Sequence, residues 1–89
     1  MTWEIGISRQ AEKFLKQHRF PDSIVIEPVR RAIQRLQGKA VSINMKRLSG
    51  KWKDCFRIRV GKDRIIFSID FEKQKVLIEV IDNRGQAYK

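Results

Sequence analysis

Hydrophobic and polar residues alternate in four stretches of the chain, which is the period of a β-strand with one buried face. In the first stretch, residues 2–7, Trp3, Ile5 and Ile7 share one side. The other three lie in the second half of the chain, at roughly residues 54–60, 64–71 and 76–81. Gly61-Lys62 separates two of them and is typical of a two-residue hairpin turn.

Between the first two of these strands the spacing of apolar residues changes to that of a helix. Ser8 is a suitable N-cap for a first helix, whose inner face is predicted to carry Ala11, Phe14, Leu15 and His18. Residues 20–22, Phe-Pro-Asp, end that helix.

A second helix is predicted to run to Gln37, with Gly38 as its C-cap. Pro28 either opens this helix in its first turn or kinks it, so residues 28–37 are predicted helical. Residues 23–27 fit either a helical turn or an extended segment. The inner stripe of the helix is predicted to be Val29, Ala32, Ile33 and Leu36.

This order predicts an α+β fold: an N-terminal strand, a two-helix hairpin and a three-stranded antiparallel meander, joined in one mostly antiparallel sheet. Residues 39–51 are expected to form a linker that ends in a turn over 46–51. We find no repeat and no linker to a second domain, so residues 1–89 are predicted to form a single domain. A domain of this size has little chain to spare for a deep cleft, so a functional site is expected on an open face.

Charge is the strongest compositional signal. Twenty Lys and Arg against ten Asp and Glu give a net charge of +10, which favours a polyanionic partner such as RNA. A membrane surface is the competing interpretation, but it would require a basic amphipathic helix, and the most basic segment is predicted to be strand. One cysteine and no signal-peptide pattern are what we expect of a cytoplasmic protein.

The basic residues concentrate between positions 46 and 64, where eight cations face two acids. The turn at Gly61-Lys62 would pair Arg59 with Arg64 across the hairpin and place Arg57 two residues along the same face. Like charges opposite each other destabilise a sheet unless an anion lies between them, and guanidinium groups match phosphate oxygens. The alternative is a solvated outer face neutralised by nearby acids; the net charge favours the anion site.

Other candidate chemistry is sparse. One His, one Cys and scattered acids suggest no metal site and no cofactor. His18 is expected to be packed on the inner face of its helix. Cys55 falls on the arginine side, where cations would lower its pKa, or it is simply a small strand residue. Trp3 and Trp52 are expected to pack, with Trp52 the better candidate for stacking on a base.

Three sequence runs together resemble the RelE-type toxins of the RelE/ParE toxin–antitoxin superfamily, in the same order of elements along the chain. The runs are Lys46-Arg47-Leu48-Ser49-Gly50, then Asp54-Cys55-Phe56-Arg57-Ile58-Arg59-Val60-Gly61-Lys62-Asp63-Arg64-Ile65-Ile66-Phe67, then Val80-Ile81-Asp82-Asn83-Arg84-Gly85-Gln86-Ala87-Tyr88. The resemblance implies a RelE-like fold and a metal-independent mRNA endonuclease that acts on the ribosome, silenced by a cognate antitoxin.

The resemblance also implies which residues act. Its catalytic set corresponds to Arg57, Arg59, Arg64, Arg84 and Tyr88. A basic surface is expected to dock on RNA through Lys46, Arg47, Lys51, Lys53 and Lys62. The reaction implied is attack of a ribose 2′-OH on the adjacent phosphate, with guanidinium groups stabilising the developing charge.

The sequence departs from the family pattern at positions 57 and 59, where the best-known members carry Lys. An Arg does not release its proton, so Tyr88 becomes the leading candidate for the general base. Asn83 stands where many relatives carry His. Two other functions stay open: a ParE-like toxin that inhibits DNA gyrase, and a non-catalytic domain that binds RNA or the ribosome. The short helical segment and the Arg84 and Tyr88 ending argue against the first.

Overall fold

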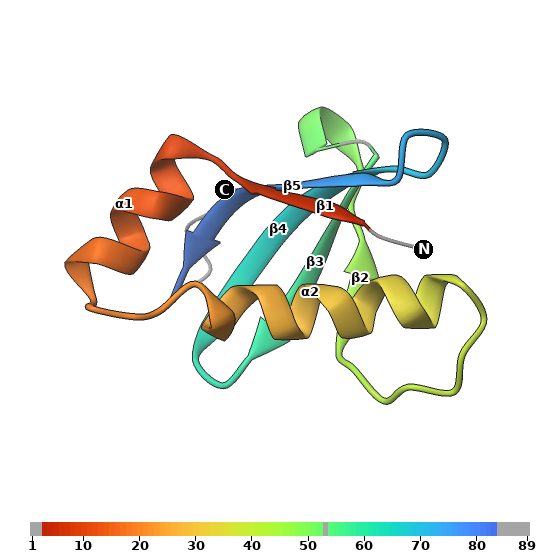
Figure 1. The fold of residues 1–89 in the computed structure, drawn as a ribbon, viewed down its shortest axis with the longest axis horizontal. Coiled ribbons are helices and arrows are strands. Elements are labelled where there is room, and N and C mark those ends of the chain that lie inside the picture. The colour runs from red at the N-terminus through yellow and green to blue at the C-terminus, as the bar shows by residue number, and fades with distance from the viewer. Residues whose placement is uncertain (1–2, 53, 84–89) are drawn as a thin grey trace.

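The computed structural model describes residues 3–52 and 54–83 and has an α+β fold. Two helices, α1 (Arg9–Gln17) and α2 (Ser23–Leu36), are followed by a short 3-10 turn, η1 (Gly50–Trp52). The strands are β1 (Glu4–Ile7), β2 (Met45–Arg47), β3 (Cys55–Val60), β4 (Asp63–Asp70) and β5 (Lys75–Asp82). They form one sheet in the order β1-β5-β4-β3-β2, as Figure 1 shows. β1 is parallel to β5 and the other pairs are antiparallel, which confirms the predicted fold class.

The hairpin register predicted from the sequence is confirmed. Val60 pairs with Asp63, Arg59 with Arg64 and Ile58 with Ile65. Gly61 has φ +60°, a left-handed conformation that glycine adopts at little cost. Because the side chains alternate, this register holds most apolar residues of both strands on one face and the arginines on the other. Ile66, opposite Arg57, is a buried apolar residue on the arginine side.

The prediction of an unstructured linker over residues 39–51 was wrong at its centre. Met45–Arg47 forms the edge strand β2, which pairs antiparallel with β3. Three residues are too few to show a clear alternation, and two of them are basic, so the pattern suggested a turn. The sheet therefore has five strands where the sequence predicted four.

The core lies between the two helices and one face of the sheet. α1 contributes Ala11 and Leu15, and α2 contributes Val25, Val29, Ala32 and Ile33, all of them buried. The sheet side consists of Ile58, Ile65, Phe67, Val76, Ile78 and Ile81. We call this the inner face of the sheet and the opposite one the outer face. Figure 1 shows α2 lying along the sheet and α1 at one end of it.

Helix α2 begins before residue 28, the first residue of the segment that the sequence predicted to be helical. It starts at Ser23, so Pro28 lies inside it. Val25, buried in the core, gains its contacts only if this first part is helical. At the other end Gly38 has φ +91°, and the amides of Gly38 and Lys39 donate to the carbonyls of Arg35 and Gln34. This is the Schellman arrangement, so the predicted glycine stop is confirmed.

His18 is exposed, and the expectation that it packs on the inner face of α1 was wrong. It is the C-cap of the helix, where its Nδ1 lies 2.9 Å from the carbonyl oxygen of Phe14. Its ring stacks on Phe14 at 4.1 Å and Phe20 at 5.6 Å between centroids. The helix ends one residue before His18, so the ring leaves the inner stripe.

Neither helix in the described ranges is both long enough and apolar enough to cross a membrane.

Candidate anion-binding face

Four cations gather on the outer face of the sheet, on the strands β2, β3 and β4. Arg59 and Arg64 are directly opposite each other, and Lys46 is opposite Arg57 one row further along. We call Lys46, Arg57, Arg59 and Arg64 the arginine face. Strand alternation puts all four side chains on the side away from the helices, as the sequence predicted for the three arginines.

Arg57 is the most firmly held member of the arginine face. Its side chain is half-buried, and its Nη2 donates to Oδ1 of Asn44 at 3.4 Å. The carbonyl oxygen of Asn44 accepts from the amide of Arg59 at 3.1 Å, so the same residue contacts both arginines. Nε of Arg57 is buried without a hydrogen-bond partner among the described residues. A buried donor without a partner lowers the stability of the fold.

The arginine face keeps an excess of positive charge. Within the described part of the chain, Arg57 and Arg59 form no ion pair; the pairs found there are Lys16–Glu12, Arg30–Glu27 and Lys75–Glu4. Two carboxylates lie near the arginine face on the same side of the sheet. Asp82 is the register neighbour of Arg64, and Glu79 accepts a hydrogen bond from the hydroxyl of Ser68 at 3.0 Å. Four cations therefore outnumber the acids beside them, which leaves a surface suited to an anion.

Cys55 does not have the lowered pKa that its place beside the arginines suggested. The thiol is buried, and its pKa is raised above the ordinary value of 9.0 by desolvation first, then by the negative charges of Glu79 and Asp54. The thiol therefore stays protonated and is a packed strand residue, not a reactive nucleophile. The sequence missed Glu79 because a β-bulge between Ile78 and Val80 sets its direction.

The chain that joins β2 to β3 lies on the outer side of the sheet, opposite α2, and carries η1 (Figure 1). Trp52 is half-buried there, and its indole Nε1 is buried without a partner in the described residues. The ammonium of Lys51 lies 5.9 Å from the centroid of the Trp52 ring. Partial burial fits the expectation that Trp52 packs.

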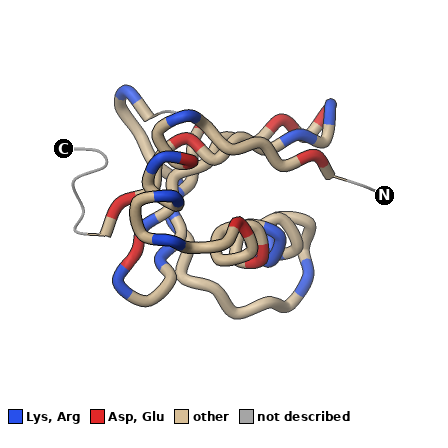
Figure 2. The backbone as a smooth tube through the Cα atoms, turned by 60° about the vertical axis from the view of Figure 1, so that its left-hand side comes forward, with Lys and Arg blue, Asp and Glu red and all other residues tan. Residues whose placement is uncertain are grey.

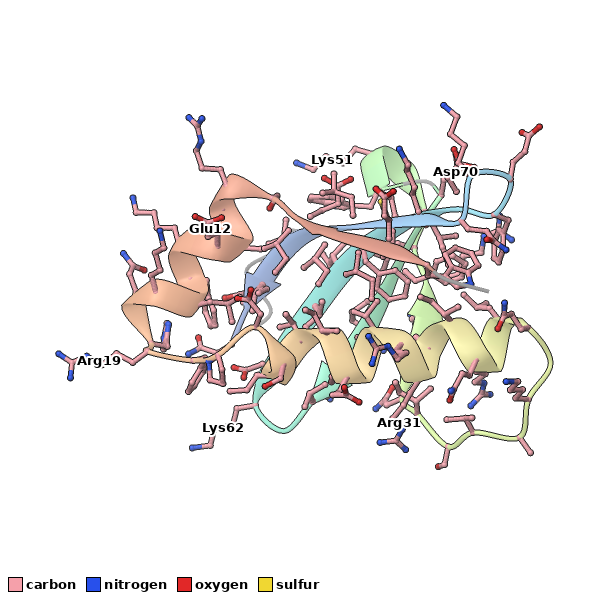
Figure 3. The ribbon with its side chains drawn as sticks, viewed as in Figure 1. Glu12, Arg19, Arg31, Lys51, Lys62 and Asp70 are labelled. Atoms are coloured by element: carbon pink, nitrogen blue, oxygen red, sulfur yellow. The ribbon has the colours of Figure 1, made fainter. Side chains whose placement is uncertain are left out.

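The cations predicted to bind RNA are not all on one surface. Arg47 is on the inner side, with its guanidinium carbon 6.0 Å from the centroid of Phe56. Lys51 and Lys62 point outward on opposite sides of the molecule, at the top and the bottom of Figure 3. Figure 2 likewise shows Lys and Arg spread around the whole tube with acids between them. Lys53, Arg84 and Tyr88 lie outside the described residues, so their predicted roles stay predictions.

The arginine face is open, as expected for a small domain. Described hollows lie elsewhere, among them one of about 500 Å³ lined by Leu36, Arg47, Asp54, Phe56, Ile69 and Phe71. No group of three or more His, Cys, Asp or Glu within residues 3–52 and 54–83 is arranged to hold a metal ion. The arrangement can bind and polarise a phosphate by hydrogen bonds and charge.

No protein-family model matches the sequence, and no curated protein matches it either. Solved structures do match over nearly the whole chain. The Mycobacterium tuberculosis RelBE2 toxin–antitoxin complex is 24% identical, with a TM-score of 0.61 over 94% of this chain and 100% of that one. The Pyrococcus horikoshii RelE–RelB complex is also 24% identical, with a TM-score of 0.63 over 98% and 100%.

YafQ from E. coli is only 10% identical, yet its TM-score is 0.58 over 99% of this chain and 100% of that chain. These relatives are RelE-type toxins of toxin–antitoxin systems. The fold of the chain is thus that of a RelE-type toxin, as the sequence resemblance implied.

Proposed function

We propose that this protein is the toxin of a type II toxin–antitoxin system and that it cleaves mRNA on the ribosome. The observation that carries the proposal is the arginine face: three guanidinium groups and one ammonium on an open sheet, with a fold shared with RelE-type toxins. Ribosomes and mRNA would be its targets, in the cytoplasm. Cleavage would need no metal or other cofactor.

The proposed reaction is an internal phosphoryl transfer. The 2′ oxygen of a ribose forms a bond to its own 3′ phosphorus, and the bond from phosphorus to the 5′ oxygen of the next nucleotide breaks. Arg57, Arg59 and Arg64 would bind the phosphate oxygens, where negative charge builds up in the transition state. The asparagine contact to Arg57 supports this role, because a guanidinium already held in place loses less entropy on binding.

The proton of the 2′-OH needs an acceptor other than an arginine, since guanidinium groups keep their protons. We assign this role to Tyr88, with Arg84 beside the phosphate. An unperturbed phenol has a pKa of about 10, so neighbouring cations would have to lower it. The leaving 5′ oxygen would take a proton from water.

A cognate antitoxin is the expected protein partner. The M. tuberculosis and P. horikoshii relatives are toxin–antitoxin complexes. For a toxin with a charge of +10 we propose an acidic antitoxin segment that covers the arginine face or displaces the C-terminal residues. A neutralising antitoxin that left Arg57, Arg59 and Arg64 fully exposed would contradict the first of these.

The second candidate function is binding to RNA or the ribosome without cleavage. The observation that favours it is arginine at positions 57 and 59, where a proton-accepting lysine is absent. The two functions share the surface and differ only in whether RNA is cut.

Mapping of mRNA ends after induction in cells tests the proposal. Wild type is expected to produce new 5′ ends within translated codons. Arg64→Ala and Tyr88→Phe are expected to lower their number by about a hundredfold, the size of losing one transition-state contact. Lys13→Ala, an exposed residue of α1, is the matched control and should cleave as wild type. Growth arrest with intact mRNA would remove the endonuclease proposal, and ribosome binding without cleavage would favour the second function.

A further inference from the structure

Strand β5 is longer than the strand that flanks it on its outer edge. β1 pairs with β5 only from Lys75 to Ile78, whereas β5 continues to Asp82. Within the described residues, the backbone from Glu79 onward therefore has β4 on one side and no strand on the other. A bulge in the β4–β5 ladder falls at the same place and weakens the pairing further.

Side chains from the start of α1 occupy that missing edge. The amide of Ser8 donates to the carbonyl of Ile78 at 2.9 Å, and its hydroxyl donates to the carbonyl of Glu79 at 2.6 Å. Gln10 then pairs with the backbone of Ile81 in both directions. Its Nε2 donates to the carbonyl of Ile81 at 3.3 Å, and its Oε1 accepts from the amide of Ile81 at 3.1 Å. A side-chain amide thus makes the two bonds of a neighbouring strand.

The two roles of Ser8 and Gln10 differ. The hydroxyl of Ser8 also accepts from the amide of Ala11 at 3.1 Å, so Ser8 is needed as the N-cap of α1. Gln10 is exposed and does not cap the helix. Its described hydrogen bonds go to Ile81, which lies three residues before Arg84 in the chain. Asp82, the next residue, is the register neighbour of Arg64.

We infer that Gln10 is a positioning residue for catalysis. It holds the end of β5, where Asp82 is the register neighbour of Arg64, and so fixes this end of the strand relative to the arginine face. This inference rests on the proposed endonuclease function. A misplacement of about 1 Å in a catalytic group can cost about a hundredfold in rate, so a loose β5 end would lower kcat. Binding of RNA to the three arginines should change little, since they lie on β3 and β4 whereas the hydrogen bonds of Gln10 go to β5.

The test compares Gln10→Met with Gln10→Glu. Methionine keeps the length and the helix propensity of glutamine but removes both hydrogen bonds. Glutamate keeps an acceptor for the amide of Ile81 and loses the donor. Gln17→Met, in the last turn of the same helix, is the matched control because Gln17 is exposed. Cleavage of mRNA on purified ribosomes gives kcat and KM, and amide hydrogen exchange of Ile81 reports the bond directly in the free protein.

Gln10→Met is expected to speed exchange of the Ile81 amide at least tenfold and to leave that of the core residue Ile58 unchanged. It should lower kcat by about tenfold or more with KM within about twofold. Unchanged exchange of Ile58 would show that the lower kcat does not come from a loss of overall stability. Gln10→Glu keeps the bond to the Ile81 amide but sets a second acceptor against the Ile81 carbonyl, so it should restore both quantities only in part. Gln17→Met should match wild type.

The failures can be told apart. An active wild type whose kcat is the same in Gln10→Met overturns this inference and leaves the proposed function standing. Unchanged exchange of Ile81 in Gln10→Met overturns it as well. A wild type that cleaves nothing overturns the proposed function, and with it any catalytic role for Gln10, even where exchange of Ile81 responds as expected.

Discussion

Two features of the outer face lower the stability of the free protein. Arg59 and Arg64 are directly opposite each other, a pairing of like charges that costs a sheet roughly 0.2–1 kcal/mol. Nε of Arg57 is buried without a partner in the described chain. Both features are unfavourable, and an anion bound between Arg59 and Arg64 would relieve the first. Such a conflict between stability and charge is typical of a binding site.

Replacing one arginine of the pair should therefore stabilise the protein. We expect Arg59→Gln to raise the free energy of unfolding by about 0.5 kcal/mol in about 0.01 M salt and by much less in about 1 M salt, where the repulsion is screened. Urea unfolding at the two salt concentrations measures this. Lys13→Gln removes the same charge from exposed α1 and should change stability little. Equal changes in both variants would show that overall charge, not the cross-strand pair, is responsible.

Cys55 should make stability fall at high pH. Burial, then Glu79 and Asp54, raise the pKa of the folded thiol above 9.0, so the unfolded chain loses this proton first as pH rises. The contribution of the Cys55 thiol to the free energy of unfolding is thus fully present below pH 9. It decreases above pH 9, because the folded state then binds more protons than the unfolded state. Unfolding free energies measured across this range should decline more steeply for wild type than for Cys55→Ala. Parallel curves for the two proteins would contradict the raised pKa.

At the scale of elements, the sequence predicted those features that depend on neighbouring residues alone. The β3–β4 hairpin follows from a two-residue turn between alternating strands, and the register of that turn is enough to place Arg57, Arg59 and Arg64 on one face. The edge strand β2 could not be predicted, since three residues gain their partner only from β3.

Long-range contacts account for the remaining gaps. Asn44 and Gln10 carry no pattern of their own, and their roles come from backbone brought close by the folded sheet. The helical start at Ser23 was ambiguous because Pro28 disfavours helix locally, while burial of Val25 favours it.

The proline inside α2 gives a prediction for that element. Pro28 provides no amide for the carbonyl four residues earlier and costs a helix interior about 3 kcal/mol relative to alanine. Against this, Pro28→Ala loosens the unfolded chain, worth about 0.4–1 kcal/mol in the other direction. We expect a net rise of about 2 kcal/mol in the free energy of unfolding by urea. Gly38→Ala, at φ +91°, should instead lower it by about 1 kcal/mol. A loss of stability in Pro28→Ala would show that the ring packs better than it disrupts.

At the scale of the whole molecule, some of the positively charged side chains stabilise the fold through hydrogen bonds. Arg31 donates to the carbonyl of Ser42 at 2.7 Å, and Arg35 donates to that of Ile43 at 3.3 Å. Both tie α2 to the connection that leads into β2. The helices cover the inner face of the sheet, so the arginine face lies on the side that a polyanion would approach. We therefore propose that the inner face of the sheet holds most of the core and that the arginine face binds anions.

This separation predicts that small phosphate anions stabilise the free protein through the arginine face. A ligand that binds only the native state adds about 2.7 kcal/mol when its concentration is about a hundred times its Kd. For a domain of this size each kcal/mol raises Tm by about 4–8 °C. Pyrophosphate, compared with chloride at equal ionic strength, should raise the Tm of wild type and of Lys13→Gln alike. Arg59→Gln should gain half as much or less, although it starts from a more stable protein. Equal gains in all three would mean that pyrophosphate acts on the net charge of +10 as a whole, and the arginine face would then be no specific site.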